Sequence, residues 1–416
     1  MRAMKQSGIP WIVEIPENWF VVPTKQIMRK NKEICDKYNG EDIISLTMQG
    51  VIKRDLINPK GKMPSTFDGY QKIYKNNLLL CLFDIDVTPR CAGLICDNGL
   101  TSPAYSQFVL NGNAYPPYYA YYLIAIDNEK SYLHLSKNLR STITEDDFGM
   151  IPIIYPPLPE QTTIANFLDN KCSKIDVLIE NEEKMILELS DYKNQLAVHY
   201  TTKGLNKTKL KQSNVDWIGE IPEHWQILPL YAIFREHKSK NTGMKENNLL
   251  SLSYGNIIRK NINTDEGLLP ENFEGYNIVK QGDIVLRLTD MQNDQRSLRT
   301  GLVREQGIIT SAYVTIRNYI NANSEYLRYL LHSADICKII YNFGFGIRQN
   351  LKFSELKRMD LILPPRNEQD EIVTFLNKKF LEVDSLITTK KQKITELKDY
   401  KKSLIYEYVT GKKEPV

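Results

Sequence analysis

The pattern of hydrophobic and polar positions divides the chain into two kinds of segment, and each kind occurs twice. Up to about Pro157, and again up to about Pro365, short β-type runs are separated by Gly and Asn turns. Examples are "NLLLCLF" at 77–83 against "DIVLRL" at 283–288, and "QFVLN" at 107–111 against "YVTIRN" at 313–318. Each half of the chain therefore begins with a mixed globular domain.

The second kind of segment opens with a Pro-Pro pair and has Glu160 or Glu368 in its first turn, and it continues as a long helical pattern without Gly or Pro. Alternating steps of four and three give two heptad seams, a pattern typical of coiled coils. The first seam is Ile164, Leu168, Lys171, Ile175, Leu178, Glu182, Met185, Leu189, Tyr192 and Leu196. The second is Ile372, Leu376, Lys379, Val383, Leu386, Lys390, Lys393, Leu397, Tyr400 and Leu404. The alternative is a long amphipathic helix packed on its own domain.

Polar residues interrupt both seams near their midpoints, Glu182 in the first and Lys390 in the second. If the helices pair antiparallel, the midpoints meet, and a contact between Glu182 and Lys390 would fix register because any slip leaves a charge unpaired. We state this contact as a hypothesis.

A long internal repeat relates the two halves. "WIVEIPENW" at 11–19 recurs as "WIGEIPEHW" at 217–225, 206 residues later, and after a two-residue insertion the shift becomes 208. The second helix ends where the first copy could begin, so the chain termini should be neighbours. The sequence thus predicts an α+β fold with two pseudo-symmetric mixed α/β domains, separated by two long antiparallel coiled-coil helices.

Composition narrows the class without identifying a function. The net charge of +4 is only mildly basic, so phosphate binding would depend on local patches. The six cysteines lack paired CxxC spacing and have no neighbouring histidines, which predicts reduced thiols and no metal site. The start of the chain is polar, so a cytoplasmic location is expected. No phosphate loop, acceptor-Asn methyltransferase motif or nuclease carboxylate set is present in the sequence.

Three repeated motifs together resemble the specificity subunit of type I restriction-modification systems. They are "W-I-x-E-I-P-x-x-W" opening each half, "PP-x-x-EQ" opening each helix, and "D-Y-K-x-x-L" near each helix end. The resemblance implies a noncatalytic subunit that reads a bipartite, asymmetric site on double-stranded DNA. Its parts would be target recognition domain 1 (1–157), spacer helix 1 (158–204), a linker with target recognition domain 2 (205–365), and spacer helix 2 (366–412).

The resemblance also implies partners. Two methyltransferase subunits would dock on the spacer helices, and restriction or translocase subunits could join them. No cofactor is expected on this chain; S-adenosylmethionine, ATP and Mg would belong to the partner subunits.

Candidate DNA-contact residues come from two comparisons of the copies. Arg, Asn and Gln in divergent segments suit base contacts in the major groove, whereas cations at equivalent positions suit phosphate contacts. The base-contact candidates are Arg90, Gln292, Asn293, Gln295, Arg296 and Arg299. The phosphate candidates are Lys53, Arg54, Arg140, Arg259, Lys260 and Arg348. For each of them the alternative is an ordinary solvated surface charge. Tyrosine-rich "YPPYYAYYL" is predicted to be the apolar face of a helix and not a stacking platform.

Two other functions remain open from sequence. A catalytic restriction or methylation polypeptide would need one of the motifs that the sequence lacks. A coiled-coil scaffold without DNA contact would give no sequence-specific footprint.

Overall fold

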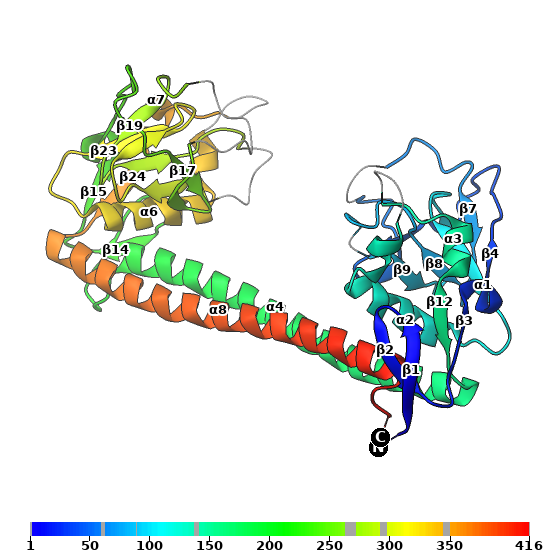
Figure 1. Cartoon of the computed structure of the whole chain (residues 1–416). Helices are drawn as coiled ribbons and strands as arrows, with labels where there is room; N and C mark the ends of the chain where they lie inside the picture. Colours follow the sequence, from blue (N-terminus) through cyan, green and yellow to red (C-terminus); the bar gives the residue numbers. More distant parts are fainter. Residues whose placement is uncertain are drawn as a thin grey trace. The chain divides into compact units, whose positions relative to one another are not determined.

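The computed structural model describes residues 2–59, 63–88, 90–136, 141–262, 272–291, 298–343 and 350–415. The chain forms two compact units, in which unit 1 contains residues 1–183 and 391–416 and unit 2 contains residues 184–390. Each unit combines one module of strands and short helices with parts of the two long helices (Figure 1). The mixture of helices with antiparallel strand pairs confirms the predicted α+β class.

The module of unit 1 is built on a four-stranded antiparallel sheet in the order β4-β11-β8-β9, with four two-stranded pairs, β1-β2, β3-β12, β5-β6 and β7-β10. Its strands are β1 (Met4–Ile9), β2 (Ile12–Pro16), β3 (Phe20–Pro23), β4 (Met28–Asn31), β5 (Ile44–Thr47), β6 (Gly50–Lys53), β7 (Gln71–Ile73), β8 (Leu78–Leu80), β9 (Ala92–Leu94), β10 (Gly99–Thr101), β11 (Ser106–Leu110) and β12 (Pro152–Tyr155). All three residues of β8 are buried, because this strand is covered on both faces.

The module of unit 2 repeats this topology strand for strand, with the sheet β16-β23-β20-β21 and the pairs β13-β14, β15-β24, β17-β18 and β19-β22. Its strands are β13 (Leu210–Gln212), β14 (Glu220–Pro222), β15 (Gln226–Pro229), β16 (Phe234–Glu236), β17 (Leu250–Ser253), β18 (Asn256–Arg259), β19 (Asn277–Val279), β20 (Ile284–Leu286), β21 (Thr300–Leu302), β22 (Gly307–Ile309), β23 (Val314–Asn318) and β24 (Asp360–Leu363).

A glycine in each module lets one hairpin pack closely on the sheet. A Cβ on Gly93 of β9 would lie 2.7 Å from Cγ2 of Val51, and one on Gly301 of β21 would lie 2.6 Å from Cδ1 of Leu252. Only glycine permits this approach, so hairpins β5–β6 and β17–β18 pack against the sheets of their modules in the same way.

The short helices also have counterparts at the same places in the two modules. Unit 1 has α1 (Thr24–Ile27), α2 (Pro116–Asn128), the 3-10 helix η1 (Ser131–Leu135) and α3 (Glu145–Met150). Unit 2 has α5 (Leu230–Ile233), α6 (Ser324–Ile336), the 3-10 helix η2 (Ile339–Phe343) and α7 (Phe353–Leu356). The tyrosine-rich stretch forms α2, and Tyr118, Tyr119 and Tyr122 are buried, which confirms its predicted role in packing.

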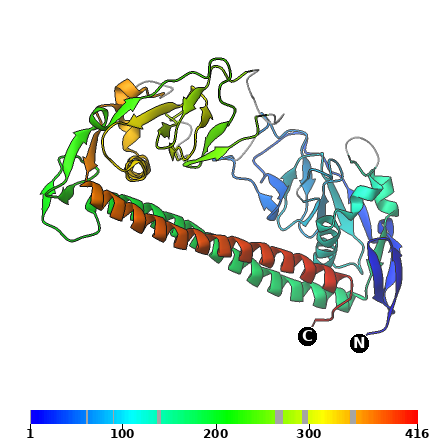
Figure 2. The ribbon, with the colours of Figure 1, turned by 60° about the vertical axis from the view of Figure 1, so that its left-hand side comes forward.

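The long helices are α4 (Leu158–Lys203) and α8 (Arg366–Val409), close to the predicted spacer segments 158–204 and 366–412. Gly204 and Gly411, both with positive φ, follow the two helix ends, as is usual where a helix stops. In Figures 1 and 2, α4 and α8 lie side by side within each unit.

The predicted seam is correct at its start, where Ile164 and Ile372 are buried, but it is wrong at every second position from Leu178 and from Leu386 onward. Leu178, Met185, Tyr192, Leu386 and Tyr400 are between 43% and 57% exposed, although the pattern placed them inside. The following residue takes the inner position, as Ile179 and Ile394 show at 9% and 8% exposure. Hydrophobic residues stand side by side at 178–179, 185–186 and 386–387, so the sequence allowed either choice.

Candidate nucleic-acid interface and its supports

The second tryptophan of each repeated phrase binds the first turn of a long helix. Nε1 of Trp19 donates a hydrogen bond to Oε2 of Glu160, and Nε1 of Trp225 donates to Oε2 of Glu368, both at 2.9 Å. The two indoles are almost completely buried. The phrase therefore fixes each module to the start of one helix.

The glutamine after each of these glutamates makes a second connection. Oε1 of Gln161 accepts from the backbone N–H of Tyr115 at 2.8 Å, and Oε1 of Gln369 accepts from that of Asn323 at 2.7 Å. Both glutamines are fully buried, and both also donate to a proline carbonyl at the helix start. The "EQ" of the repeated motif thus ties each long helix to the N-terminus of α2 or α6.

Each module also binds the end of the other long helix. Oη of Tyr118 donates to the carbonyl of Val409 at 2.7 Å, and Oη of Tyr326 donates to that of Thr201 at 3.0 Å. Every module is therefore held between the start of one helix and the end of the other.

The chain termini lie together in unit 1, as predicted. Nη1 of Arg2 is 3.4 Å from Oε1 of Glu414.

Equivalent ion pairs join α4 and α8 in each unit. Nζ of Lys401 lies 2.6 Å from Oδ1 of Asp176 in unit 1, and Nζ of Lys193 lies 2.7 Å from Oδ1 of Asp384 in unit 2. In unit 1 the stacked rings of Phe167 and Tyr408 form a second contact between the helices. Phe167 precedes Asp176 on α4, whereas Tyr408 follows Lys401 on α8, so the two helices run in opposite directions. The predicted antiparallel pairing is confirmed within each unit.

The predicted register contact between Glu182 and Lys390 stays a prediction, because the two residues belong to different units. Glu182 is buried and its Oε1 accepts a hydrogen bond from Nζ of Lys393 at 2.6 Å. Nζ of Lys390 lies 3.3 Å from Sδ of Met185.

Among the base-contact candidates, Arg299 is wrong. Its side chain has no exposed surface, and its guanidinium donates to Oη of Tyr341 and to the carbonyls of Arg287 and Thr289, each at 2.9 Å. A guanidinium whose donors are used inside the module has no route to a base, so Arg299 supports the start of β21. Sequence could not reveal this, because a buried and an exposed Arg look alike in one chain.

Arg90 is half-buried in a cleft of about 620 Å³ between the module and the long helices of unit 1, together with Asp176 and Lys401. Burial lowers the pKa of its guanidinium, and the carboxylates of Asp127 and Asp176 oppose that effect. Base contact by Arg90 stays a prediction. The candidates Gln292, Asn293, Gln295 and Arg296 lie outside the described residues.

Two phosphate candidates lie at equivalent ends of hairpins and are exposed. Nζ of Lys53 is 2.6 Å from Oδ1 of Asp42, and Nε of Arg259 donates to Oε1 of Glu305 at 2.6 Å. A DNA phosphate would have to replace these carboxylates as partner. Phosphate contact therefore stays a prediction for them and for their neighbours Arg54 and Lys260. Arg140 and Arg348 lie outside the described residues.

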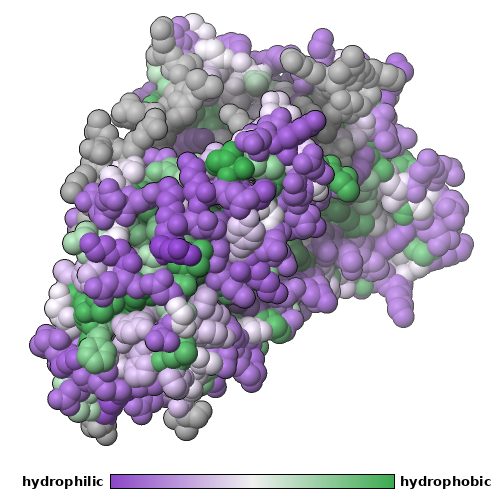
Figure 3. Space-filling view, turned by 90° about the vertical axis from the view of Figure 1, so that its right-hand side faces the viewer, coloured by the Kyte–Doolittle hydropathy of each residue, from purple (hydrophilic) through white to green (hydrophobic). Residues whose placement is uncertain are grey.

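Within the described ranges, no cluster of three or more His, Cys, Asp or Glu side chains is arranged to hold a metal ion, and no helix is long and apolar enough to cross a membrane. The face in Figure 3 is mainly hydrophilic with small, separate hydrophobic patches.

The chain is similar to known proteins of type I restriction-modification systems. The family model "Type I restriction modification DNA specificity domain" matches residues 223–398. The MjaVIII type I restriction enzyme specificity subunit of Methanocaldococcus jannaschii is 26% identical over 282 residues, which is 64% of this chain and 63% of that one. The putative MjaX specificity subunit of the same organism is 26% identical over 314 residues, 73% of this chain and 69% of that one.

A solved structure from work on the complex assembly and conformational transition of the type I R-M system has a similar fold. Its TM-score is 0.67 at 14% identity, and the match covers 95% of this chain and 98% of the other.

Proposed function

The chain belongs to the specificity subunits of type I restriction-modification systems, and we propose that it reads a bipartite, asymmetric site on double-stranded DNA with one module for each half-site. It is a noncatalytic subunit, as its curated relatives are specificity subunits. The MjaVIII alignment spans only 63% of that relative, so DNA site and partners are proposals for this chain.

This proposal rests on the observation that both modules are attached to the long helices by the same contacts. The Trp19–Glu160 and Trp225–Glu368 bonds are the same, while the copies diverge strongly in the sequence segments 84–92 and 290–300, which come after β8 and after β20 along the chain. A common support with different sequences in these segments is what two different half-sites require. A scaffold without DNA contact would have no use for this divergence.

Exchange of residues 1–157 for the corresponding module of another specificity subunit tests the assignment of one half-site to each module. Modified adenines would be sequenced in a host that carries the hybrid and its methyltransferase. We expect one half of the split motif to change and the other to stay. A change in both halves, or in neither, would contradict the proposal.

We further propose that the exposed apolar row on the long helices docks two methyltransferase subunits. Two pairs of exposed residues repeat at a shift of 208, Leu178 with Leu386 and Tyr192 with Tyr400. The antiparallel register places Leu178 near Tyr400 in unit 1 and Tyr192 near Leu386 in unit 2. Each unit therefore carries one Leu–Tyr pair, which suits one partner present in two copies.

The pairs lie away from the clefts between module and helices. Leu178 follows Asp176 by two residues, and Leu386 follows Asp384 by two, which is about 200° around a helix. Asp176 and Asp384 line the clefts, whereas none of the four Leu and Tyr side chains does. An apolar row that the helix's own partner leaves open is the expected contact of a further helix.

Single-pair variants make the docking proposal testable. Leu178→Asp with Tyr400→Asp should leave one methyltransferase subunit per chain in place of two, measured by native mass spectrometry of the purified complex. Leu187→Asp is the matched control, since Leu187 is 66% exposed and its counterpart is a threonine, Thr395. Two bound subunits in the double variant would refute the assignment.

The remaining expectations follow from this function. S-adenosylmethionine, ATP and Mg are proposed to bind the partner subunits and not this chain. Restriction subunits are proposed as further partners, and the cytoplasm as the location, where the DNA substrate is found.

A further inference from the structure

Unit 2 contains a cleft of about 680 Å³ between α6, the tip of hairpin β17–β18 and the long helices. Glu325, Arg328 and His332 line it, and their spacing of three and four residues places them on one face of α6. The equivalent positions of α2 are Pro117, Ala120 and Ile124. A polar wall in unit 2 thus replaces an apolar wall in unit 1.

Two guanidinium groups on this wall share one carboxylate oxygen. Nη2 of Arg304 and Nη2 of Arg328 donate to Oε1 of Glu325 at 2.9 and 3.2 Å. One carboxylate balances one of these charges, and each guanidinium has five N–H donors, so positive charge and donors remain. Arg328 is held in place because its guanidinium stacks on the ring of Tyr329 at 3.8 Å and its side chain is only 15% exposed.

The other charged groups of the cleft do not remove this surplus. Lys193 is balanced by Asp384. His332 is 8% exposed, and burial together with the charges of Arg328 and Lys193 lowers its pKa to about 4, so the ring is neutral at pH 7. Its Nδ1 is buried and has no hydrogen-bond partner within the described part of the chain. A buried polar atom without a partner is unusual in a finished structure and points to a ligand.

We infer that this cleft binds a phosphate group, with Arg304 and Arg328 as its principal donors. Planar guanidinium forks match phosphate oxygens in geometry and charge. The cleft has room for more than a phosphate ion, and Tyr254, 81% exposed at the hairpin tip, also lines it. The phosphate can therefore belong to a free ion, to a mononucleotide or to a DNA backbone. Unit 1 lacks the site, because Arg304 and Arg328 are Cys96 and Ala120 there.

His332 serves as the reporter for the test. The full chain with 13C-labelled histidine would be titrated by NMR in chloride and in inorganic phosphate at equal ionic strength, with the His332 signal assigned from a His332→Gln variant. A bound anion should raise the pKa of His332 by about 1, a tenfold gain in proton affinity. Arg304→Gln should abolish the difference, and this exposed position gives little risk of unfolding. Arg358→Gln, also exposed in unit 2, is the matched control. The absence of a phosphate effect, or its persistence in Arg304→Gln, would overturn the inference.

Two further measurements identify the molecule to which the phosphate belongs. If deoxyadenosine monophosphate acts at lower concentration than the inorganic ion, the cleft takes a nucleotide. If the phosphate belongs to DNA, Arg304→Gln should weaken binding of the assembled complex equally for all sequences and reduce the salt slope by about 1. These measurements are independent of the proposed half-site function, since the NMR test uses neither DNA nor partner subunits. A negative result there leaves the module exchange untouched.

Discussion

The joints that connect α2 and α6 to the long helices use one shared contact and two different helix starts. In both, a buried glutamine accepts a hydrogen bond from the residue before the short helix. In unit 1 that helix begins with Pro116 and Pro117, which have no N–H groups to satisfy. In unit 2 it begins with Ser324 and Glu325, and the side chain of Asn323 accepts hydrogen bonds from the N–H groups of Glu325 and Tyr326.

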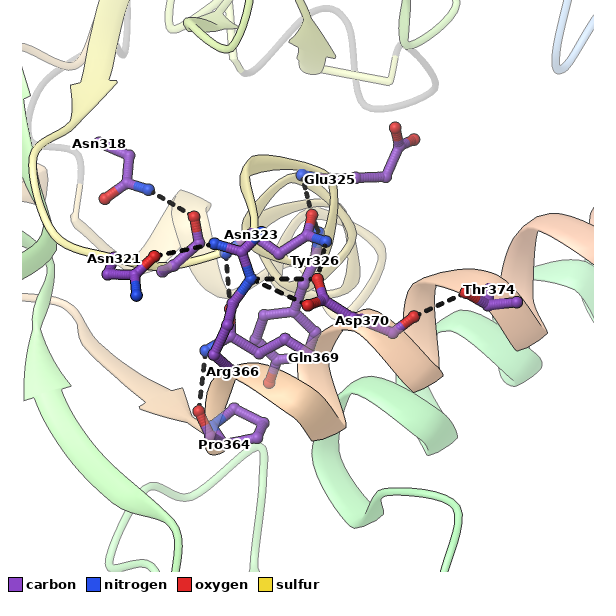
Figure 4. A network of polar contacts seen from close by, with 11 residues as sticks. Asn318, Asn321, Asn323, Glu325, Tyr326, Pro364, Arg366, Gln369, Asp370 and Thr374 are labelled. Atoms are coloured by element: carbon purple, nitrogen blue, oxygen red, sulfur yellow. Dashed lines mark hydrogen bonds and ion pairs between the residues drawn. The ribbon is translucent and has the colours of Figure 1, made fainter.

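The unit 2 joint is also linked to α8 by side chains, as Figure 4 shows. Nδ2 of Asn323 donates to Oδ1 of Asp370 at 2.6 Å, and Arg366 connects the same aspartate to Asn321. The counterpart of Asp370 in unit 1 is Thr162. The comparison teaches that the repeated Trp, Glu and Gln contacts place the module, while the unrepeated residues solve the local problem of unpaired helix donors.

The largest effect should come from removing the tryptophan that binds the first turn of a long helix in each unit. Trp19→Ala and Trp225→Ala each delete a fully buried side chain and its bond to a helix glutamate, which should lower the free energy of unfolding by about 3–5 kcal/mol. Each loss should be confined to the unit concerned. Urea unfolding measures the loss in free energy, and hydrogen exchange shows in which unit protection is lost. Equal loss of protection in both units would contradict separate joints.

A smaller effect should follow from neutralising the glutamates, and it should differ between the joints. Glu160 accepts hydrogen bonds from Trp19, Arg2 and Asn18, whereas Glu368 accepts from Trp225 and His224. Loss of charge-assisted bonds should make Glu160→Gln cost about 1–3 kcal/mol, and Glu368→Gln less. Urea unfolding of the two variants checks the order.

The cost of Glu160→Gln should also depend on pH. Burial favours the protonated form of Glu160, but the hydrogen bonds to its carboxylate outweigh burial and hold its pKa below the ordinary value. A pKa that is lower in the folded state gives stability that is present above the unfolded pKa, about 4.3, and is lost as pH falls through the folded pKa. The difference between native chain and variant should therefore shrink below about pH 4. A difference that stays constant down to pH 3 would show that the charge plays no part.

Next in size is the cap that only unit 2 has. Asn323→Ala removes an acceptor from the first turn of α6 and should cost about 1–2 kcal/mol, with loss of hydrogen-exchange protection in that turn. Tyr115 is the matched position in unit 1. Its side chain makes no capping hydrogen bond, so the first turn of α2 has no such cap that a substitution could remove. Unchanged protection in Asn323→Ala would contradict the capping role of this side chain and would leave the bond from its backbone N–H to Gln369 as the contact that holds the joint.

The sequence allowed the repeat, the α+β class, the long helices, their antiparallel pairing and the neighbouring termini to be predicted, because each rests on spacing. It did not separate inner from outer residues where two hydrophobics adjoin, as at Leu178 and Ile179, since either phase fits a heptad. It also assigned Arg299 to the surface by residue type, although three-dimensional packing decides that question. The shared "EQ" could have revealed the joints, because both copies keep it.

The smallest effect should come from the ion pairs between the long helices, where the two units are most alike. Asp176–Lys401 and Asp384–Lys193 each include an exposed carboxylate, so Lys401→Ala or Lys193→Ala should cost no more than about 1 kcal/mol. Reversal of one charge, Lys401→Glu, should cost more than Lys401→Ala because it sets two carboxylates together. Adding Asp176→Lys should recover most of that loss. If the double reversal were no better than the single one in urea unfolding, the pair would contribute packing through the lysine stem and not charge, and the equivalence of the two units would lie in shape alone.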